Sequence, residues 1–494
     1  MYGNQRLCGW RQSAVVLFVI GIQLYSRAET YSDKEINRAI TTELSTDKAV
    51  DAHLVDVSVD NGFVTLSGSV ANLLSKDRAE RICMSLNGVR GIMNELHVVP
   101  VHRKPGEIRK DVNRALSEDP VTERQELSLS VQHDTVILKG YAHSISEKML
   151  VAETVKGIRG VSCLVNMIEV RPAEPPSDEE IRREVEGLLD SDPYIYAKMI
   201  TVAVSAGMVQ LTGTVGSFSE KMFARLDCYV PGAKAVRDTG LTVKFWAGDP
   251  LRREGKLVIK SDSTIVRELK ELFEQDPLVL PYRVSVSMDH GTVTLRGKVG
   301  TLRAKRQAEE SALHLVGVYS VKNEIKVRLT TTVADTIIKS IITMDLQRDP
   351  IVGRHALKVV VRNAKAYLYG AVDNLYEQRH ATRIVEKIPG IVAVANLTEI
   401  RENRMPWLHL NDELIKENIL REYHFAFLID PLDLTVEVRK GVATISGSIE
   451  SALELDAIIR HAFDSGAKMV VTQLLFNGRK EYGAYDYRNY AGLD

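Results

Sequence analysis

The chain has 494 residues, too many for one ordinary hydrophobic core, so several domains are expected. With 45% hydrophobic and 26% charged residues, its composition is typical of a protein that folds in water, and it leaves no long tract for disorder. The formal net charge of −1 excludes a global basic field for nucleic acid, so any electrostatic binding has to be local.

The first segment, residues 1–28, has the layout of a secretory signal peptide. Arg6 and Arg11 supply positive charge, residues 13–24 form a short apolar run, and Ala28 ends a small-residue cleavage pattern. We therefore predict cleavage after Ala28 and a periplasmic location, with peripheral contact at the outer or inner membrane left open. The alternative is an uncleaved anchor, although about 12 apolar residues are few against the roughly 20 that a span needs.

A helix is the next predicted element. It begins near Asp33, which we expect to be its N-cap residue, and Ile36, Ile40 and Leu44 recur along one apolar face. It ends at Asp47, and later copies place an Asp-Pro pair at this point. Proline disfavours helical geometry in the residue before it, so the pair is expected to end the helix.

A β-hairpin, a second helix and a last strand complete the unit. Asn61-Gly62 is a hairpin turn signal between two runs in which apolar and polar residues alternate. The apolar positions of these elements are Val57, Val59, Val64 and Leu66 in the hairpin, Ala79, Cys83 and Leu86 in the helix, and Ile92 and Leu96 in the last strand. The predicted unit is an α+β module in which two helices cover one face of a three-stranded mixed sheet.

This unit recurs six times in tandem. Asp47 lies twenty-one residues before a strand glycine, and a second glycine follows nineteen or twenty residues later. The Asp-Pro pairs of the later copies are Asp119-Pro120, Asp192-Pro193, Asp276-Pro277, Asp349-Pro350 and Asp430-Pro431. The first glycines are Gly68, Gly140, Gly213, Gly297, Gly370 and Gly447, and the second are Gly88, Gly160, Gly232, Gly317, Gly390 and Gly466. In the sixth copy the first interval is read as seventeen residues.

Six modules and a tail account for the chain after the signal peptide. Modules 1 to 6 are assigned to residues 32–100, 105–171, 177–245, 261–329, 333–401 and 410–477, and the Tyr-rich tail to 478–494. A unit of about 70 residues is marginally stable alone, so neighbouring units are expected to cover one another. The tail is interpreted as a docking strand or a loose end.

The repeat resembles the BON domain, the module of osmotically inducible periplasmic proteins of the OsmY type. Two patterns carry the resemblance: the strand glycine, as in TLSGSV and TLRGKV, and a later Gly-Val followed by a hydrophobic residue and an asparagine. The second pattern is Gly88, Val89, Ile92 and Asn94 in module 1, Gly160, Val161, Leu164 and Asn166 in module 2, and Gly317, Val318, Val321 and Asn323 in module 4.

Modules 3 and 6 depart from this pattern. Module 3 has Asp238 in place of the asparagine, and Gly240 is expected to break its last strand, while module 6 has Thr472. The resemblance implies an envelope protein that binds phospholipid surfaces and protects the envelope under osmotic stress. The family is mostly known with two modules, so six imply an extended scaffold.

No catalytic or metal-binding motif stands out. The sequence has no GxSxG, Walker-type, HExxH or GxGxxG signature, and its twelve histidines recur at no common position. We therefore expect no enzyme, cofactor, metal or small-molecule substrate. The twelve glycines are interpreted as structural. Cys83 and Cys228 share a core position, whereas Cys163 lies off the inward register and is expected to be exposed.

The candidate binding residues are basic and aromatic. Residues 251–329 hold 15 basic and 10 acidic residues, whereas residues 29–100 hold 7 and 11, so the modules differ in charge. The candidates for contact with an anionic phospholipid membrane are Arg296, Lys298, Arg303, Lys305, Arg306, Trp246, Arg252 and Arg253. The alternatives are a solvated helix face for the cations and packing between modules for the tryptophan. A scaffold for other envelope proteins is the alternative function.

Overall fold

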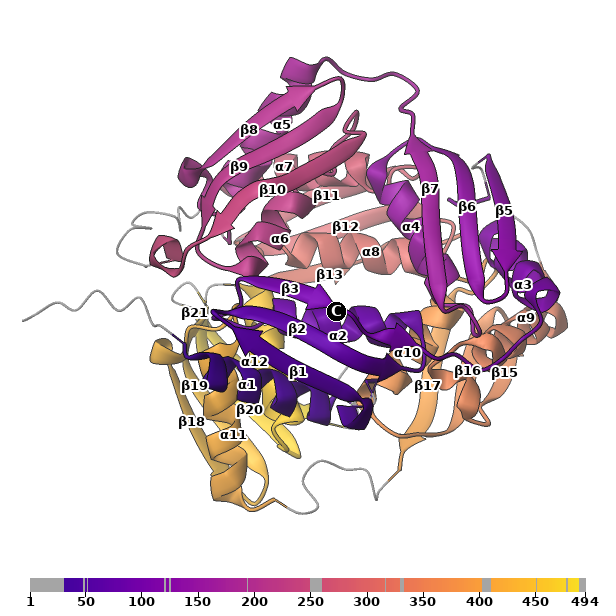
Figure 1. Cartoon of the computed structure of the whole chain (residues 1–494). Coiled ribbons are helices and arrows are strands. Elements are labelled where there is room, and N and C mark those ends of the chain that lie inside the picture. The colour runs from indigo at the N-terminus through magenta and orange to yellow at the C-terminus, as the bar shows by residue number, and fades with distance from the viewer. Residues whose placement is uncertain are drawn as a thin grey trace, which may run out of the picture.

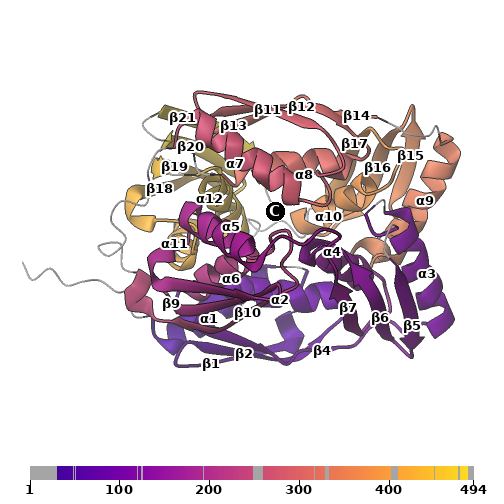
Figure 2. The ribbon, with the colours of Figure 1, turned by 90° about the horizontal axis from the view of Figure 1, so that it is seen from above.

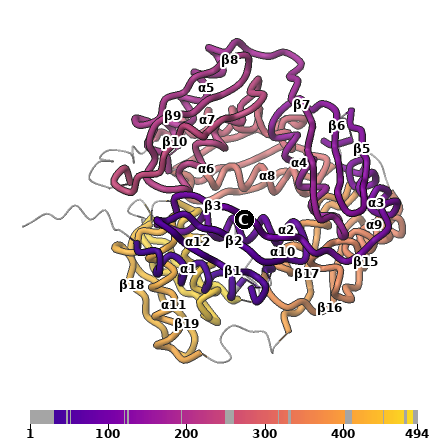
Figure 3. Tube along the Cα trace, viewed as in Figure 1, coloured from indigo at the N-terminus to yellow at the C-terminus, as the bar shows by residue number. Residues whose placement is uncertain are grey.

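The computed structural model describes residues 31–487 except 48, 51, 120, 124–125, 193, 249–259, 316, 329–332, 402–409, 450 and 477–478. The predicted signal peptide, residues 1–28, lies outside the described residues. Within them one α+β unit occurs six times, which confirms the predicted fold class (Figures 1 and 3). In each unit the second strand lies in the middle of the sheet, antiparallel to the first strand and parallel to the third.

Every module uses the same order of helix, strand, strand, helix and strand. Modules 1 to 3 contain α1 (Asp33–Thr46), β1 (Val55–Asp60), β2 (Phe63–Val70), α2 (Leu73–Met84), β3 (Gly91–Asn94) and β4 (His97–Val98); α3 (Pro105–Glu118), β5 (Leu127–Gln132), β6 (Thr135–Ala142), α4 (Ile145–Lys156) and β7 (Cys163–Val170); and α5 (Asp178–Ser191), β8 (Ile200–Ser205), β9 (Met208–Val215), α6 (Phe218–Leu226) and β10 (Ala235–Val243). Modules 4 to 6 contain α7 (Asp262–Gln275), β11 (Val284–Asp289), β12 (Thr292–Val299), α8 (Leu302–Leu313), β13 (Ser320–Asn323) and β14 (Lys326–Val327); α9 (Asp335–Arg348), β15 (Lys358–Arg362), β16 (Lys365–Val372), α10 (Leu375–Glu386) and β17 (Ala393–Ile400); and α11 (Asp412–Phe425), β18 (Leu434–Arg439), β19 (Val442–Ile449), α12 (Ala452–Asp464), β20 (Met469–Phe476) and β21 (Arg479–Asp486).

The cap of the first helix differs from the prediction by one residue. Ser32, not Asp33, is the N-cap of α1, and it forms a reciprocal capping box with Glu35. Asp33 instead accepts hydrogen bonds from the amides of Asn61 and Gly62 and so fastens the hairpin turn to the helix. The corresponding aspartates of modules 3, 5 and 6 make the same contact. Ser32 and Asp33 are adjacent and both residue types can act as an N-cap, so the sequence alone did not decide between them.

The aspartate after the first helix has a local structural reason. Asp47 is the C-cap of α1, and its carboxylate accepts a hydrogen bond from the amide of Ala49, two residues on. Module 6 corrects the prediction of a shortened interval. Its helix α11 ends at Phe425, and Ala426, twenty-one residues before Gly447, occupies the C-cap position. Asp430 begins a separate turn, so the Asp-Pro pair was matched to the wrong position.

The strand glycine permits a close backbone approach. Gly68 has φ +103°, and a Cβ there would lie 2.1 Å from the carbonyl oxygen of Leu54, the residue before β1. A side chain would therefore both strain the backbone and separate the first two strands. The equivalent glycines of the other five modules also have positive φ.

The six modules close around a common centre, with helices inside and sheets outside (Figures 1 and 2). This arrangement corrects the expectation of an extended scaffold. The two helices of a module cover the inner face of its sheet, and their remaining apolar residues are covered by other modules. Segments far apart in the sequence therefore lie side by side; for example, the Tyr31 hydroxyl donates a hydrogen bond to the carbonyl of His424.

Modules 1, 2 and 3 form one closed group through equivalent residues. The first residue of the second helix enters the core of the next module: Leu73 of module 1 lies in the core of module 2, and Ile145 of module 2 lies in that of module 3. Phe218 of module 3 packs against the core of module 1 and completes the cycle. Each module is thereby held by a neighbour on both sides.

Modules 4, 5 and 6 repeat the arrangement. Leu302 of module 4 packs against the core of module 5, and Leu375 of module 5 lies in the core of module 6. Tyr319 of module 4 contacts the core of module 6, with its ring centroid 5.1 Å from that of Phe476. The six modules therefore form two groups of three.

Modules 1 and 6 join the two groups through both core and backbone contacts. Phe425, the last residue of α11, is buried in the core of module 1. The amide of Asn87 donates to the carbonyl of Phe425 at 2.7 Å, and Leu86 and Ala426 form a β-bridge. Backbone and core contacts thus connect the first module to the last.

Two further strands differ from expectation. In module 3, β10 continues past Gly240 with a register shift between Arg237 and Gly240, so the strand is bulged rather than broken. The first part of the tail forms β21, which pairs antiparallel with β20 and gives module 6 a fourth strand. Tyr490 lies outside the described residues.

Replacing Phe425 tests the junction of modules 1 and 6. Phe425→Ala should lower the free energy of unfolding by about 3 kcal/mol or more, because it opens a cavity in the core of a different module. Urea unfolding followed by circular dichroism measures the change. Leu432→Ala, at a side chain that is 80% exposed, is the matched control and should cost less than about 0.5 kcal/mol. Equal effects of the two variants would contradict the docking of these modules.

Candidate functional site

A groove on module 4 gathers positive charge on the outer side of the molecule. It has a volume of about 870 Å³ and runs over β12 and the short interruption between β13 and β14. We call it the cationic groove, and its cations are Arg283, Arg296, Lys298, Lys305 and Lys326. Glu324, Ile325 and Gly297 complete its lining. Figure 2 shows β11, β12 and β14 on the outside of the assembly, with α7 and α8 behind them.

Strand alternation places these side chains on one face. In β12, Val293, Leu295 and Val299 are buried, whereas Arg296 and Lys298 are exposed. Lys326 is the parallel-strand partner of Lys298. Arg283 directly precedes the pair Val284–Gly297, which sets it level with Lys298 across the sheet. Three cations therefore lie in one row across the sheet, on β12, on β14 and directly before β11.

The groove contains more positive than negative charge. Arg296 pairs with Glu324 at 2.7 Å on the exposed surface. Among the described residues, no carboxylate lies within ion-pair distance of Lys298 or Lys326. Neighbouring like charges repel each other, so this row costs the isolated fold some stability.

Lys305 reaches the groove from helix α8. In modules 2 and 3 the lysine at this helix position donates to a carbonyl of the third strand, Lys148 to Ile168 and Lys221 to Leu241, and in module 1 Lys76 donates to Leu96, between β3 and β4. Lys305 lines the groove instead.

Two of the predicted cations, Arg303 and Arg306, lie elsewhere. Arg303 pairs with Asp119 of module 2 at 2.9 Å, and Arg306 with Glu386 of module 5 at 2.6 Å. Residues 303, 305 and 306 are neighbours on one helix, but successive helical residues point about 100° apart. The predicted five-residue patch is therefore divided: Arg296, Lys298 and Lys305 share the groove, and Arg303 and Arg306 join modules. Arg283 and Lys326 were missed, although strand alternation could have found them.

The aromatic candidate lies outside module 4. Trp246 belongs to a short 3-10 helix, Phe245–Gly248, at the end of module 3 and is 45% exposed. Arg252 and Arg253 lie outside the described residues, as does Trp407. The structure therefore places Trp246 but does not bring it into the cationic groove.

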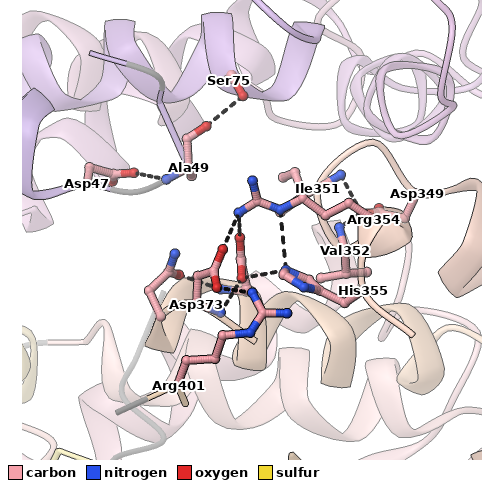
Figure 4. A network of polar contacts seen from close by, with 12 residues as sticks. Asp47, Ala49, Ser75, Asp349, Ile351, Val352, Arg354, His355, Asp373 and Arg401 are labelled. Carbon is pink, nitrogen blue, oxygen red and sulfur yellow. Dashed lines mark hydrogen bonds and ion pairs between the residues drawn. The ribbon is translucent and has the colours of Figure 1, made fainter. Parts of the chain in front are cut away.

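A polar network in module 5 resembles a catalytic site but is built differently (Figure 4). His355 lies 2.8 Å from Glu377, and both are buried. Arg354 forms ion pairs with Glu377 and Asp373, and Arg401 forms one with Asp373. The Glu377 carboxylate also accepts a hydrogen bond from the backbone amide of Asp373, while the Glu377 backbone amide donates to Oδ1 of the N-cap residue Asn374. The carboxylates are thus occupied by arginines and amides, which favours a structural role.

Charged side chains also meet inside the assembly. A cavity of about 280 Å³ lies between modules 2, 4 and 5, and its lining includes Asp119, Glu147, Arg303 and Lys387. The Lys387 side chain is exposed, but desolvation by the surrounding protein and the positive charge of Arg303 still lower its pKa to about 8. The resulting cost to stability is small, because solvent screens an exposed charge.

The cysteines take the positions expected of them. Cys83 and Cys228 are buried, and burial raises the pKa of each thiol to about 12, whereas Cys163 is exposed at the start of β7. His314 lies exposed at the end of α8, and His380 contacts Asp349 of its own module at 2.7 Å. Across the described residues we find no helix with the length and apolarity needed to cross a membrane.

Comparison with known proteins identifies the repeated unit. Residues 32–100, 106–172, 177–244, 261–328, 334–402 and 411–478 match the family described as BON domain. Osmotically-inducible protein Y of Escherichia coli (strain K12) is 22% identical over 204 residues, which are 40% of this chain and 96% of that protein.

Two solved structures of CdsD, a structural protein of the type III secretion system of Chlamydia trachomatis, also match. They are 15% and 16% identical and cover 43% and 45% of this chain and 96% and 94% of theirs. Their TM-scores are 0.12 and 0.13, so this likeness carries no argument.

Lys387 provides a pH-dependent test of the inner junction. Its folded pKa, about 8, lies below the unfolded value near 10.4, so this group destabilises the folded protein below pH 8 and the penalty disappears as pH rises towards 10.4. Lys387→Met should therefore raise the melting temperature at pH 7, and its advantage over the wild type should shrink between pH 8 and 10. Lys110→Met, at an exposed lysine that does not line this cavity, is the control. A difference that does not vary with pH would contradict the assignment.

Proposed function

The chain belongs to the BON domain family, and from this membership we propose that it is a non-enzymatic periplasmic protein that binds anionic phospholipid surfaces through the cationic groove of module 4. The name of the E. coli relative points to osmotic stress, and we propose that this chain likewise maintains the cell envelope under such stress. The proposed periplasmic location rests on the predicted signal peptide.

The row of Arg283, Lys298 and Lys326 carries the proposal. These side chains repel one another, and the neighbouring carboxylate, Glu324, is engaged by Arg296. A row of anionic headgroups would relieve that repulsion. Each basic side chain near an anionic membrane contributes about 1 kcal/mol, so the five cations give moderate, salt-sensitive binding.

A protein scaffold is the second candidate. The outer face of module 2 exposes Tyr141, Val165 and Met167, which are large apolar side chains on neighbouring strands. Such a surface favours a protein partner more than a lipid headgroup. This function predicts partners that crosslink to module 2 irrespective of the lipid composition.

Charge reversal tests the lipid proposal. The triple variant Arg283→Glu, Lys298→Glu and Lys326→Glu should reduce co-sedimentation with phosphatidylglycerol vesicles at least tenfold, because three attractive contacts of about 1 kcal/mol each become repulsive. The matched control changes Arg439, Lys440 and Lys480, three exposed cations of module 6, to Glu and should retain binding. Equal losses in both variants would indicate a general charge effect and contradict a site on module 4.

A substitution at Glu324 should change vesicle binding in the opposite direction. Glu324→Gln removes the carboxylate that pairs with Arg296 and should strengthen binding to the same vesicles several-fold, with a steeper dependence on salt. Sedimentation at 50 and 200 mM NaCl, with neutral phosphatidylcholine vesicles in parallel, measures this. Unchanged or weaker binding of this variant would count against the groove as the contact surface.

A further inference from the structure

Three potential metal ligands from two modules meet at the junction of modules 1 and 6. Glu43 comes from α1, Glu422 from α11 and His461 from α12. His461 Nδ1 lies 3.2 Å from Glu43 Oε1 and 3.8 Å from Glu422 Oε2, and the three ligand atoms lie within 4.8 Å of one another. The side chains are 12%, 9% and 10% exposed for Glu43, Glu422 and His461.

The histidine points to a ligand. His461 Nδ1 is buried and forms no hydrogen bond within the described part of the chain, although it is directed at two carboxylates. An imidazole nitrogen that faces two carboxylate oxygens at these distances can bind a metal ion together with them.

The two carboxylates, Glu43 and Glu422, also indicate a bound cation. Two buried carboxylates that face each other repel unless a proton or a cation lies between them. Asp464, one turn after His461 on α12, adds a third acidic group to the surroundings, and Arg460 and Arg421 are the nearby cations that act on the pair. A divalent cation between Glu43 and Glu422 would relieve their repulsion.

We propose that Glu43, Glu422 and His461 bind one divalent transition-metal ion of the zinc class and that this ion fastens module 1 to module 6. In a tetrahedral zinc site with bonds of about 2.1 Å, neighbouring ligand atoms lie about 3.4 Å apart, which is close to both separations from His461 Nδ1. Imidazole with carboxylate oxygens suits Zn²⁺, and three protein ligands leave one position for water. The ion would cross-link elements nearly 400 residues apart in sequence, beside the Leu86–Ala426 bridge.

The network in module 5 is an internal comparison. His355, Asp373 and Glu377 also bring three potential ligand atoms together. There, however, Arg354 and Arg401 form ion pairs with the carboxylates and supply the positive charge. At the junction of modules 1 and 6, the two carboxylates face an imidazole nitrogen instead.

Metal titration of the whole protein tests the proposal. After treatment with a chelator, equilibrium dialysis against Zn²⁺ should show one tightly bound ion per chain, and Co²⁺ should give visible absorption of a tetrahedral site. Zn²⁺ should also raise the melting temperature by several degrees, because it binds the folded state alone. Absence of a bound ion at micromolar Zn²⁺ would overturn the proposal.

Two variants separate metal binding from folding. Glu422→Gln has the shape of a protonated glutamate, so the metal-free protein should fold normally while the Zn²⁺-dependent rise in melting temperature and the Co²⁺ spectrum disappear. His461→Gln should behave in the same way, and His355→Gln is the matched control that should keep both signals. If Glu422→Gln and His461→Gln retain the ion, it binds elsewhere and the assignment fails. Vesicle binding is measured independently, so either proposal can fail without the other.

Discussion

The architecture depends on where the helices of each module bury their second apolar side. Two helices cover one face of a three-stranded sheet, but they are themselves covered only when another module packs on them. The first residue of the second helix provides this contact in both groups of three: it is Leu73, Ile145 or Phe218 in the first and Leu302 or Leu375 in the second. Because these side chains enter neighbouring cores, the helices turn inward and the sheets face outward.

Because the helices face inward and the sheets outward, charged residues on helices and on strands have different surroundings. Charged residues on the helices meet across module boundaries, where they are paired, as Arg114 is with Asp345 and Arg348 with Asp111. A partly buried charge without a partner would be costly, which explains why Arg303 and Arg306 face acidic residues of other modules. The outer sheet faces carry no such requirement, and unpaired cations can accumulate there.

The sequence contained enough information for the module but not for the assembly. Apolar periodicity, the Asn-Gly turn and the repeated glycines depend on contacts within about 70 residues, and these elements were predicted correctly. Contacts between modules leave no comparable pattern. Leu73 and Phe218 look like ordinary residues at a helix start, and nothing local to Glu43 indicates that Glu422 and His461 lie beside it. The sequence also could not show that Arg303 faces another module while Lys305 faces the groove, because this depends on which face of the helix other modules cover.

The repeat also indicates where function can lie. Positions shared by the modules have structural duties, such as Gly68 at a backbone contact and Asp33 at the hairpin turn. Function is therefore expected at positions that the fold does not fix. The strand pair occupied by Lys298 and Lys326 in module 4 is such a position. In modules 1, 2, 3, 5 and 6 the corresponding pairs are Ser69–His97, Tyr141–Glu169, Thr214–Thr242, Ala371–Glu399 and Ser448–Leu475. Since the module folds with serine, threonine or alanine at this place, two adjacent lysines are not needed for folding, and this is why we propose an anionic surface as their partner.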